Sequence, residues 1–320
     1  MAETRKLDGT GFDRQSGTGA TLKRTFSEFK EDSATDWAAA LTYYGVLALF
    51  PALLALVTLA GLFGNPQTTT QTILGVLEQV ASPQVLEAVR PAIMGVAMSG
   101  STALVLLIVG LVSALWSASG YVGAFMRASN VMYEVPEGRP IWKARPLQML
   151  VTLLMLLLVV AATIAIVVTG PLASALGNAI GVGSAAVTVW NIAKWPVIAL
   201  FVIAAIAVLY YASPNAKLRG FKSVLPGAAL ALVVWILASV AFAFYVANFG
   251  SYNKTYGTLG GIIIFLVWLW ITNVAIILGA EFNVERERGA QIAEGQPGAE
   301  RELQVRERDE PKDKQRPSTA

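Results

Sequence analysis

The sequence predicts an all-α integral membrane protein in which six transmembrane helices form one bundle. First, 55% of its 320 residues are hydrophobic and only 14% are charged, whereas soluble domains carry about 25% charged residues. Second, six apolar stretches reach the roughly 20 residues that a helix needs to cross a hydrocarbon core about 30 Å thick. Third, the basic residues alternate between the connecting segments. Continuous apolar runs favour helices over the alternating pattern of barrel strands.

The apolar stretches set the expected boundaries. The predicted spans cover residues 37–63, 101–126, 147–169, 191–212, 224–249 and 258–281. Polar, mixed-charge sequence flanks them, so we expect a disordered tail over residues 1–25, a membrane domain over 26–284, and a charged tail over 285–320 that is disordered or a frayed helix. In residues 64–100, apolar residues at helical spacing predict two short amphipathic helices in the first outer loop.

The distribution of basic residues gives the orientation. Of the 24 Lys and Arg residues, 21 lie in the two tails and in the loops after the second and fourth spans; only Arg90, Lys194 and Lys254 lie elsewhere. The positive-inside rule then places both termini in the cytoplasm. The basic charge is therefore mainly a topology signal, and no basic stripe with interleaved aromatic residues indicates a nucleic-acid partner.

The absence of two residue types limits the chemistry. The chain contains no Cys and no His, which excludes thiol chemistry, a catalytic His and zinc sites built on these residues. No phosphate-binding loop of the Walker type is present. We therefore expect no catalytic residues, no metal and no cofactor.

The second span carries small and polar residues on one helical face, because they recur every three or four residues. These residues are Ser113, Trp116, Gly120, Gly123, Arg127 and Asn130. One interpretation is a packing seam, since Gly and Ser let another helix approach closely. The other is a polar groove that ends at Arg127, which could attract an anionic head group. Arg127 could equally be a simple positive-inside anchor.

Two further spans supply candidate groove residues. In the first span, Tyr44 is polar and Pro51 frees a backbone carbonyl, so a kink is expected. In the sixth span, Trp270, Asn273 and Glu281 lie within about 80° of one another by helical arithmetic. Glu281 is level with Arg127 in the predicted topology, so an ion pair between them is one possibility.

Several motifs together resemble the YihY/BrkB family. They are Ala38-Ala39-Ala40-Leu41-Thr42-Tyr43-Tyr44, Arg127-Ala128-Ser129-Asn130, Tyr256-Gly257-Thr258-Leu259-Gly260-Gly261 and Gly279-Ala280-Glu281-Phe282-Asn283. The resemblance spans about residues 27–285 and implies a bacterial inner-membrane protein with six helices. Members have been called virulence factor BrkB and have carried the label ribonuclease BN. The resemblance also brings Tyr256 and Gly257 into the candidate groove.

The sequence favours transport or export of a lipid-like or amphiphilic envelope component through a groove between helices. Membrane lipids are the expected partners, and self-association is left open. The alternative is a scaffold or envelope-assembly factor that transports nothing, in which case the small-residue face only packs. Ribonuclease activity is not expected, because no His is present and the carboxylates lie in tails, loops and span ends.

Overall fold

The computed structural model describes residues 17–63, 103–167, 184–249 and 258–311. Within these ranges the secondary structure is helical apart from short turns and one isolated β-bridge between Ala216 and Glu307. The elements in chain order are α1 (Thr18–Glu31), α2 (Ala34–Phe63), α5 (Ala103–Met132), α6 (Ile141–Val167), α8 (Ser184–Ala212), the 3-10 turn η2 (Phe221–Val224), α9 (Leu225–Phe249) and α11 (Thr258–Ala293). The all-helical architecture is thus confirmed for the described residues.

Each predicted span coincides with one long helix. Four helical stretches among the described residues are long and apolar enough to cross a membrane, and they overlap the third to sixth predicted spans. Helices α2 and α5, of 30 residues each, occupy the first two. The predicted amphipathic helices of residues 64–100 lie outside the described residues.

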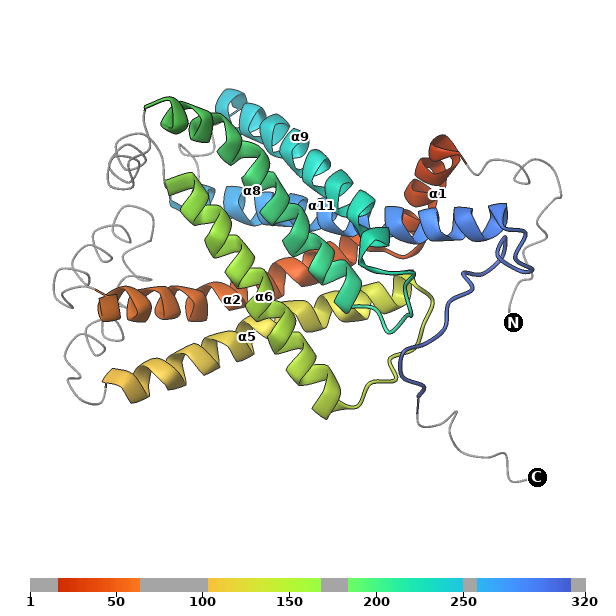
Figure 1. Ribbon diagram of the computed structural model, residues 1–320, viewed down its shortest axis with the longest axis horizontal. Helices are drawn as coiled ribbons and strands as arrows, with labels where there is room; N and C mark the ends of the chain where they lie inside the picture. Colours follow the sequence, from red (N-terminus) through yellow and green to blue (C-terminus); the bar gives the residue numbers. More distant parts are fainter. Residues whose placement is uncertain (1–16, 64–102, 168–183, 250–257, 312–320) are drawn as a thin grey trace.

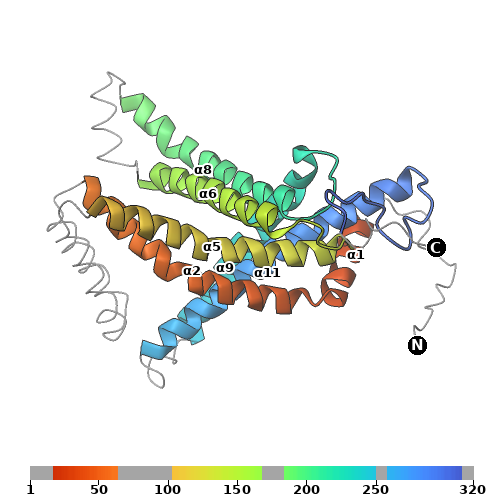
Figure 2. The ribbon, with the colours of Figure 1, turned by 90° about the horizontal axis from the view of Figure 1, so that it is seen from below.

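The long helices pack in three neighbouring pairs, α2 with α5, α6 with α8, and α9 with α11 (Figures 1 and 2). Helix α11 also packs against α2, and α5 against α6, so the pairs form one assembly. At the contact between α9 and α11, a Cβ on Gly227 would lie 2.1 Å from the carbonyl oxygen of Gly279. Only glycine permits this approach of two backbones.

Large apolar side chains point outward along α6, α8 and α9. Leu157, Leu200 and Leu237 are each more than half exposed, which is the arrangement expected of helices that face lipid. The buried core instead gathers around Phe125, Leu209 and Ile277. The outward leucines would be unfavourable in water but need no protein partner in a bilayer.

The connecting segments with most of the basic charge meet at one end of the molecule. Helix α1, residues 133–140, residues 213–224 and the chain after α11 lie together there (Figure 1). This corrects two expectations about the tails. Helix α1 already begins at Thr18, and α11 continues to Ala293. Residues 294–311 then pack back onto this end instead of being disordered, because their polar groups find partners there.

Candidate functional site

Two glycines of the small-residue face on α5 are in contact with neighbouring helices. A Cβ on Gly120 would lie 3.4 Å from the ring of Tyr44 on α2. A Cβ on Gly123 would lie 3.1 Å from the amide of Gln148 on α6. At these two positions the small residues provide close helix packing, as the seam interpretation expects.

Arg127 lies on the same face, one turn further along α5, and its side chain is exposed. Its guanidinium donates to the carbonyl oxygen of Gly123 at 3.1 Å and to the Tyr44 hydroxyl at 3.4 Å. It also lies 5.6 Å from the centre of the Tyr44 ring, within range of a cation–π contact. No carboxylate among the described residues neutralises it, so the charge remains available to an anion.

A second arginine extends this arrangement. The guanidinium of Arg145, near the start of α6, lies 5.1 Å from the centre of the Trp116 ring, and it donates to Gln148 at 3.4 Å. Trp116 itself is 53% exposed. We call these five residues the basic aromatic surface: Tyr44, Trp116, Arg127, Arg145 and Gln148. The surface pairs two cations with two aromatic rings at the point where α2, α5 and α6 meet.

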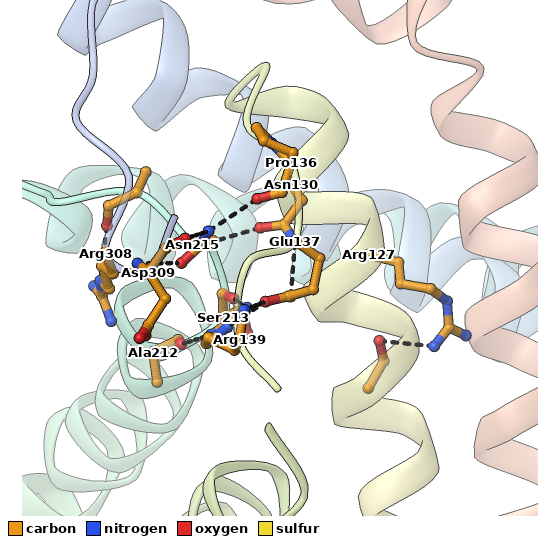
Figure 3. Close-up of polar contacts among 12 residues, drawn as sticks. Arg127, Asn130, Pro136, Glu137, Arg139, Ala212, Ser213, Asn215, Arg308 and Asp309 are labelled. Carbon is orange, nitrogen blue, oxygen red and sulfur yellow. Dashed lines mark hydrogen bonds and ion pairs between the residues drawn. The ribbon is translucent and has the colours of Figure 1, made fainter. Parts of the chain in front are cut away.

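Asn130 does not belong to this surface, although the sequence places it on the same face. It is buried on the other side of α5, away from Arg127 (Figure 3). Its amide donates to Glu137 at 2.9 Å, and its side-chain oxygen accepts the backbone N–H of Asn215 at 2.7 Å. Asn130 therefore joins the end of α5 to the segment after α8.

Arg139 is the centre of that junction. Its guanidinium binds Glu137 through two hydrogen bonds of 2.7 Å, and it donates to the backbone carbonyls of Ser213 at 2.7 Å and Ala212 at 3.4 Å (Figure 3). The last two carbonyls belong to the negative end of α8, where a cation is favoured. Burial acts to raise the pKa of Glu137, but the hydrogen bonds from Arg139 hold it below its usual value.

The chain after α11 is hydrogen-bonded to the same junction. The Asn215 amide donates to the carbonyls of Pro136 at 2.9 Å and Asp309 at 2.8 Å, and its oxygen accepts the Asp309 N–H at 3.1 Å. A Cβ on Gly138 would lie 1.8 Å from the carbonyl oxygen of Asp309, so only glycine fits there. We call the whole set the Arg139 network: Asn130, Glu137, Arg139, Ser213, Asn215 and Asp309.

Asn273 lies deep in the bundle and joins three helices. Its oxygen accepts the Tyr121 hydroxyl of α5 at 2.8 Å, and its amide donates to Thr42 of α2 at 3.1 Å. Trp270, one turn earlier on α11, is 36% exposed and donates to the backbone carbonyl of Thr35 at 3.3 Å. The two side chains therefore have different surroundings despite their spacing.

Glu281 does not pair with Arg127. It is 1% exposed and lies under the turn between α1 and α2, where it shares a hydrogen bond with the carboxyl group of Asp32. Such a bond requires a proton on one of the two carboxyls. One oxygen of Glu281, Oε1, has no hydrogen-bond partner. The predicted ion pair fails because Arg127 turns outward along its own helix.

Further charges surround Glu281. Arg24 donates to Glu285 at 2.8 Å, and Arg288 bridges Glu28 at 3.0 Å and Glu134 at 2.6 Å. We call this set the Glu285 network: Arg24, Glu28, Asp32, Glu134, Glu281, Glu285 and Arg288. It brings five carboxyl groups together with two guanidinium groups. Burial raises the pKa of Asp32, and the hydrogen bond from Glu281 offsets only part of that increase.

The remaining predicted residues contribute less to the described site. Ser113 is exposed on α5, and Pro51 lies within α2 at a position whose side chain is not described. Tyr256 and Gly257 lie outside the described residues. Sequence reasoning missed Arg145, Arg139 and Asp32, which it counted only as loop or tail charges. No local motif marks them, because each also has a partner far away in the sequence: Trp116 for Arg145, Ser213 for Arg139 and Glu281 for Asp32.

The fold and this arrangement define an all-helical integral membrane protein whose polar junctions gather at one end. The particular family follows from comparison with known proteins. The family described as Virulence factor BrkB matches residues 25–304, and the chain belongs to that family. This finding confirms the resemblance drawn from the motifs.

Curated relatives include one with a ribonuclease-like name and several that are named as membrane proteins. The ribonuclease-like protein YfkH of Bacillus subtilis is 30% identical over 276 residues, which cover 86% of this chain and 98% of YfkH. A UPF0761 membrane protein of Alkalilimnicola ehrlichii is 28% identical over 80% of this chain and 55% of its own length. Another, of Tolumonas auensis, is 38% identical over 26% of this chain and 28% of its own length. No solved structure matches the chain.

Proposed function

We propose that the protein transports or exports a lipid-like or amphiphilic envelope component along the basic aromatic surface. The observation that carries this proposal is Arg127, a cation at the edge of the bundle whose neighbours are an aromatic ring and a carbonyl. Such a group can draw in an anionic head group without first breaking an ion pair. Arg145 beside Trp116 would give the head group a second contact.

The outward leucines of the long helices support a path at the lipid boundary. An amphiphile could keep its apolar chain in the bilayer while the two arginines shield its head group. The expected mechanism is movement of the head group along the line between α2, α5 and α6. Nothing in the sequence indicates a coupling ion or the use of ATP.

Transport in reconstituted vesicles tests the proposal. Vesicles of anionic and zwitterionic fluorescent lipids with purified protein should show movement of an anionic lipid between leaflets. Arg127→Ala should reduce the initial rate at least tenfold while the protein level stays normal. Arg301→Ala, which removes an exposed cation elsewhere, should leave the rate unchanged. No movement across a broad lipid and solute panel would contradict the proposal.

The alternative is a scaffold or envelope-assembly factor that moves no substrate. The packing of Gly120 against Tyr44 and of Gly123 against Gln148 favours it, because these glycines are occupied by neighbours. In that case Arg127→Ala should lower the protein level and the unfolding temperature together. A variant of normal level and stability that loses only transport would exclude this alternative.

We further propose six spans with both termini on the cytoplasmic side of a bacterial inner membrane. Support comes from the meeting of the basic segments at one end of the bundle and from the lengths of α2 and α5. Because the chain has no Cys, single-cysteine labelling in cells is a clean test. Thr69→Cys should react with an impermeant reagent from outside and Ser27→Cys should not.

We also expect no ribonuclease activity, although one relative has a ribonuclease-like name. The absence of His from the chain supports this expectation, because RNA cleavage commonly uses a His acid–base pair or carboxylates that hold metal ions. Incubation of purified protein with RNA and Mg²⁺ or Mn²⁺ tests it. Cleavage that follows the protein through every purification step would contradict it.

A further inference from the structure

A basic cavity of about 320 Å³ lies between the segment before α9, the last turns of α11 and the chain that follows. Its polar wall contains Lys217, Arg219, Lys222, Ser223, Arg286 and Glu287. Four of these side chains are cations and one is a carboxylate. The cavity shares no residue with the basic aromatic surface, so it is a separate feature of the same molecule.

The cations of the cavity differ in whether a carboxylate of the protein balances their charge. Arg219 donates to Glu287 at 2.8 Å and to Glu294 at 2.6 Å, so its charge is balanced within the protein. Lys217 and Lys222 are exposed and have no carboxylate partner among the described residues. Within the described part of the chain, Arg286 donates to the backbone carbonyl of Ser223, at 3.4 Å, and to no carboxylate. Three positive charges therefore converge on one space without neutralisation.

The backbone next to the cavity is held in place. Asn283 accepts the N–H of Gly227 at 2.8 Å and donates to the carbonyl of Val224 at 3.0 Å, which fixes the start of α9. The N-terminal end of this 25-residue helix adds a partial positive charge close to the cations. A site whose walls are fixed before binding loses less entropy when a ligand arrives.

One wall residue adds a neutral donor. Tyr133 follows α5 and is 5% exposed. Burial raises the pKa of its hydroxyl well above the usual value, so the group keeps its proton. A protonated hydroxyl beside three cations suits an acceptor-rich anion, and phosphate oxygens are strong acceptors.

We propose that this cavity binds a phosphate group. The phosphate could belong to an anionic lipid head group or to a soluble phosphorylated compound, since both present the same oxygens. A basic pocket between helices on the predicted cytoplasmic side is typical of head-group binding. Lys217 and Lys222 act as point charges, and Arg286 offers the planar fork that suits a phosphate. The inference does not depend on transport.

Ligand-dependent stabilisation of the purified full chain in neutral detergent tests the proposal. The soluble probes are inorganic phosphate and pyrophosphate, with chloride at equal ionic strength as control. The lipid probe is short-chain phosphatidylglycerol, with phosphatidylcholine of the same chain length as control. A rise in unfolding temperature with pyrophosphate alone indicates a soluble ligand, and a rise with phosphatidylglycerol alone indicates a head group. Either result supports the proposal.

Charge-removing variants decide whether the binding occurs in the cavity. The double variant K217Q/K222Q should need about tenfold more ligand for the same stabilisation, because two of the three free charges are lost. The matched control K30Q/R301Q removes two exposed cations elsewhere and should behave like the native protein. The proposal is overturned if no probe stabilises the native protein, or if K217Q/K222Q responds at the native concentration.

Two measurements remain decisive if the double variant does not fold. The single variant Arg286→Gln should also weaken the response several-fold. In the native protein, the stabilising probe should protect Lys217 and Lys222 from acetylation, as measured by mass spectrometry, while Lys30 stays reactive. Equal acetylation of all three lysines with and without the probe would contradict the proposal.

Discussion

The Arg139 network and the Glu285 network lie at the same end of the molecule, and they differ in charge balance. In the first, the guanidinium of Arg139 binds Glu137 and two backbone carbonyls, and the second carboxylate, Asp309, pairs with Lys143. In the second, five carboxyl groups share two guanidiniums, and Glu281 Oε1, Glu285 Oε1 and Arg288 Nε form no hydrogen bond. A balanced network works as a fixed junction, whereas in the second network the carboxyls outnumber the cations and two of them, Glu281 and Glu285, are buried, which disfavours charge on the carboxyls.

The two networks therefore shift carboxyl groups in opposite directions. The pKa of Glu137 is held below its usual value by Arg139, although burial opposes this. The pKa of Asp32 is raised by burial. Neighbouring arginines alone do not decide the sign, because Arg288 also acts on Asp32. The difference is that Arg139 donates hydrogen bonds directly to Glu137, whereas Arg288 acts on Asp32 only through its charge and does not offset burial.

The largest expected effect is loss of the central cation of the balanced network. Arg139→Met removes the guanidinium that donates to Glu137 and to the carbonyls of Ala212 and Ser213, and leaves Glu137 with the amide of Asn130 but no cation. We expect a loss of about 3 kcal/mol, at the lower end for breaking a buried pair because Glu137 is partly exposed. A lower unfolding midpoint in detergent would show it, and E137Q/R139M should recover part of the loss. Arg301→Met serves as the exposed control. An unchanged unfolding midpoint for Arg139→Met would show that the Arg139 network does not stabilise the fold.

Neutralising one carboxyl in each network compares them directly. Glu137→Gln should lose about 1–2 kcal/mol, because it removes charge-assisted hydrogen bonds from Arg139. Glu281→Gln should be neutral or stabilising near pH 7, because it removes a carboxyl from a surplus and keeps the amide's hydrogen-bonding capacity. Unfolding midpoints of the two variants give the comparison. Similar losses in both would mean that the networks do not differ in the way proposed.

A smaller effect is expected in the dependence of stability on pH. A raised pKa means that the contribution of Asp32 is complete below its ordinary pKa and is lost as the pH rises through the folded-state pKa. For Glu137 the contribution is present above its ordinary pKa and is lost as the pH falls through its lowered value.

The variant Asp32→Asn tests the loss of stability that is expected from Asp32 as the pH rises. The difference in unfolding midpoint between Asp32→Asn and the native protein should become more favourable to the variant as the pH rises from 4 to 9. Glu31→Gln, a change at an exposed neighbouring carboxylate, provides the control. A difference that stays constant across this range would contradict the raised pKa.

The smallest effect is expected at the surface ion pair of Arg219 with Glu294. Glu294 is exposed, so solvent screens the interaction even though the pKa of Glu294 is lowered by its hydrogen bond from Arg219. Glu294→Gln should leave the unfolding midpoint unchanged within error at 150 mM salt. A clear decrease would show that the pair helps to hold α11 against the segment before α9.

The sequence predicted the helices well because hydrophobic length is a local property. The predicted end of the fourth span and the predicted ends of the fifth both lie within one residue of the helix ends in the structure. The ends of α5 and α11 were placed too early, at 126 and 281 instead of 132 and 293. These helices continue beyond the apolar stretch because their polar residues form contacts with other segments. On α11, for example, Arg288 forms ion pairs with Glu28 and Glu134.

The candidate site was predicted only in part. Helical spacing correctly placed Gly120, Gly123 and Arg127 on one face of α5, and that face meets Tyr44 as well as Gln148. The same spacing could not distinguish Asn130, whose partners come from residues 137 and 215. Nor could it show that Glu281 faces Asp32 instead of Arg127, since the turn between α1 and α2 covers it.

By itself, the sequence determined that this protein is an all-helical membrane protein of the BrkB family, because the length of each apolar stretch and the order of the motifs can be read without knowing which segments pack together. Only the tertiary structure decided which charges meet. Residues 24, 134, 285 and 288 are brought together by packing across helices, and the three free cations of the cavity come from two separate segments. Hydrogen bonds and ion pairs need partner atoms within about 4 Å of each other, so spacing along the chain cannot predict them once the chain turns back on itself.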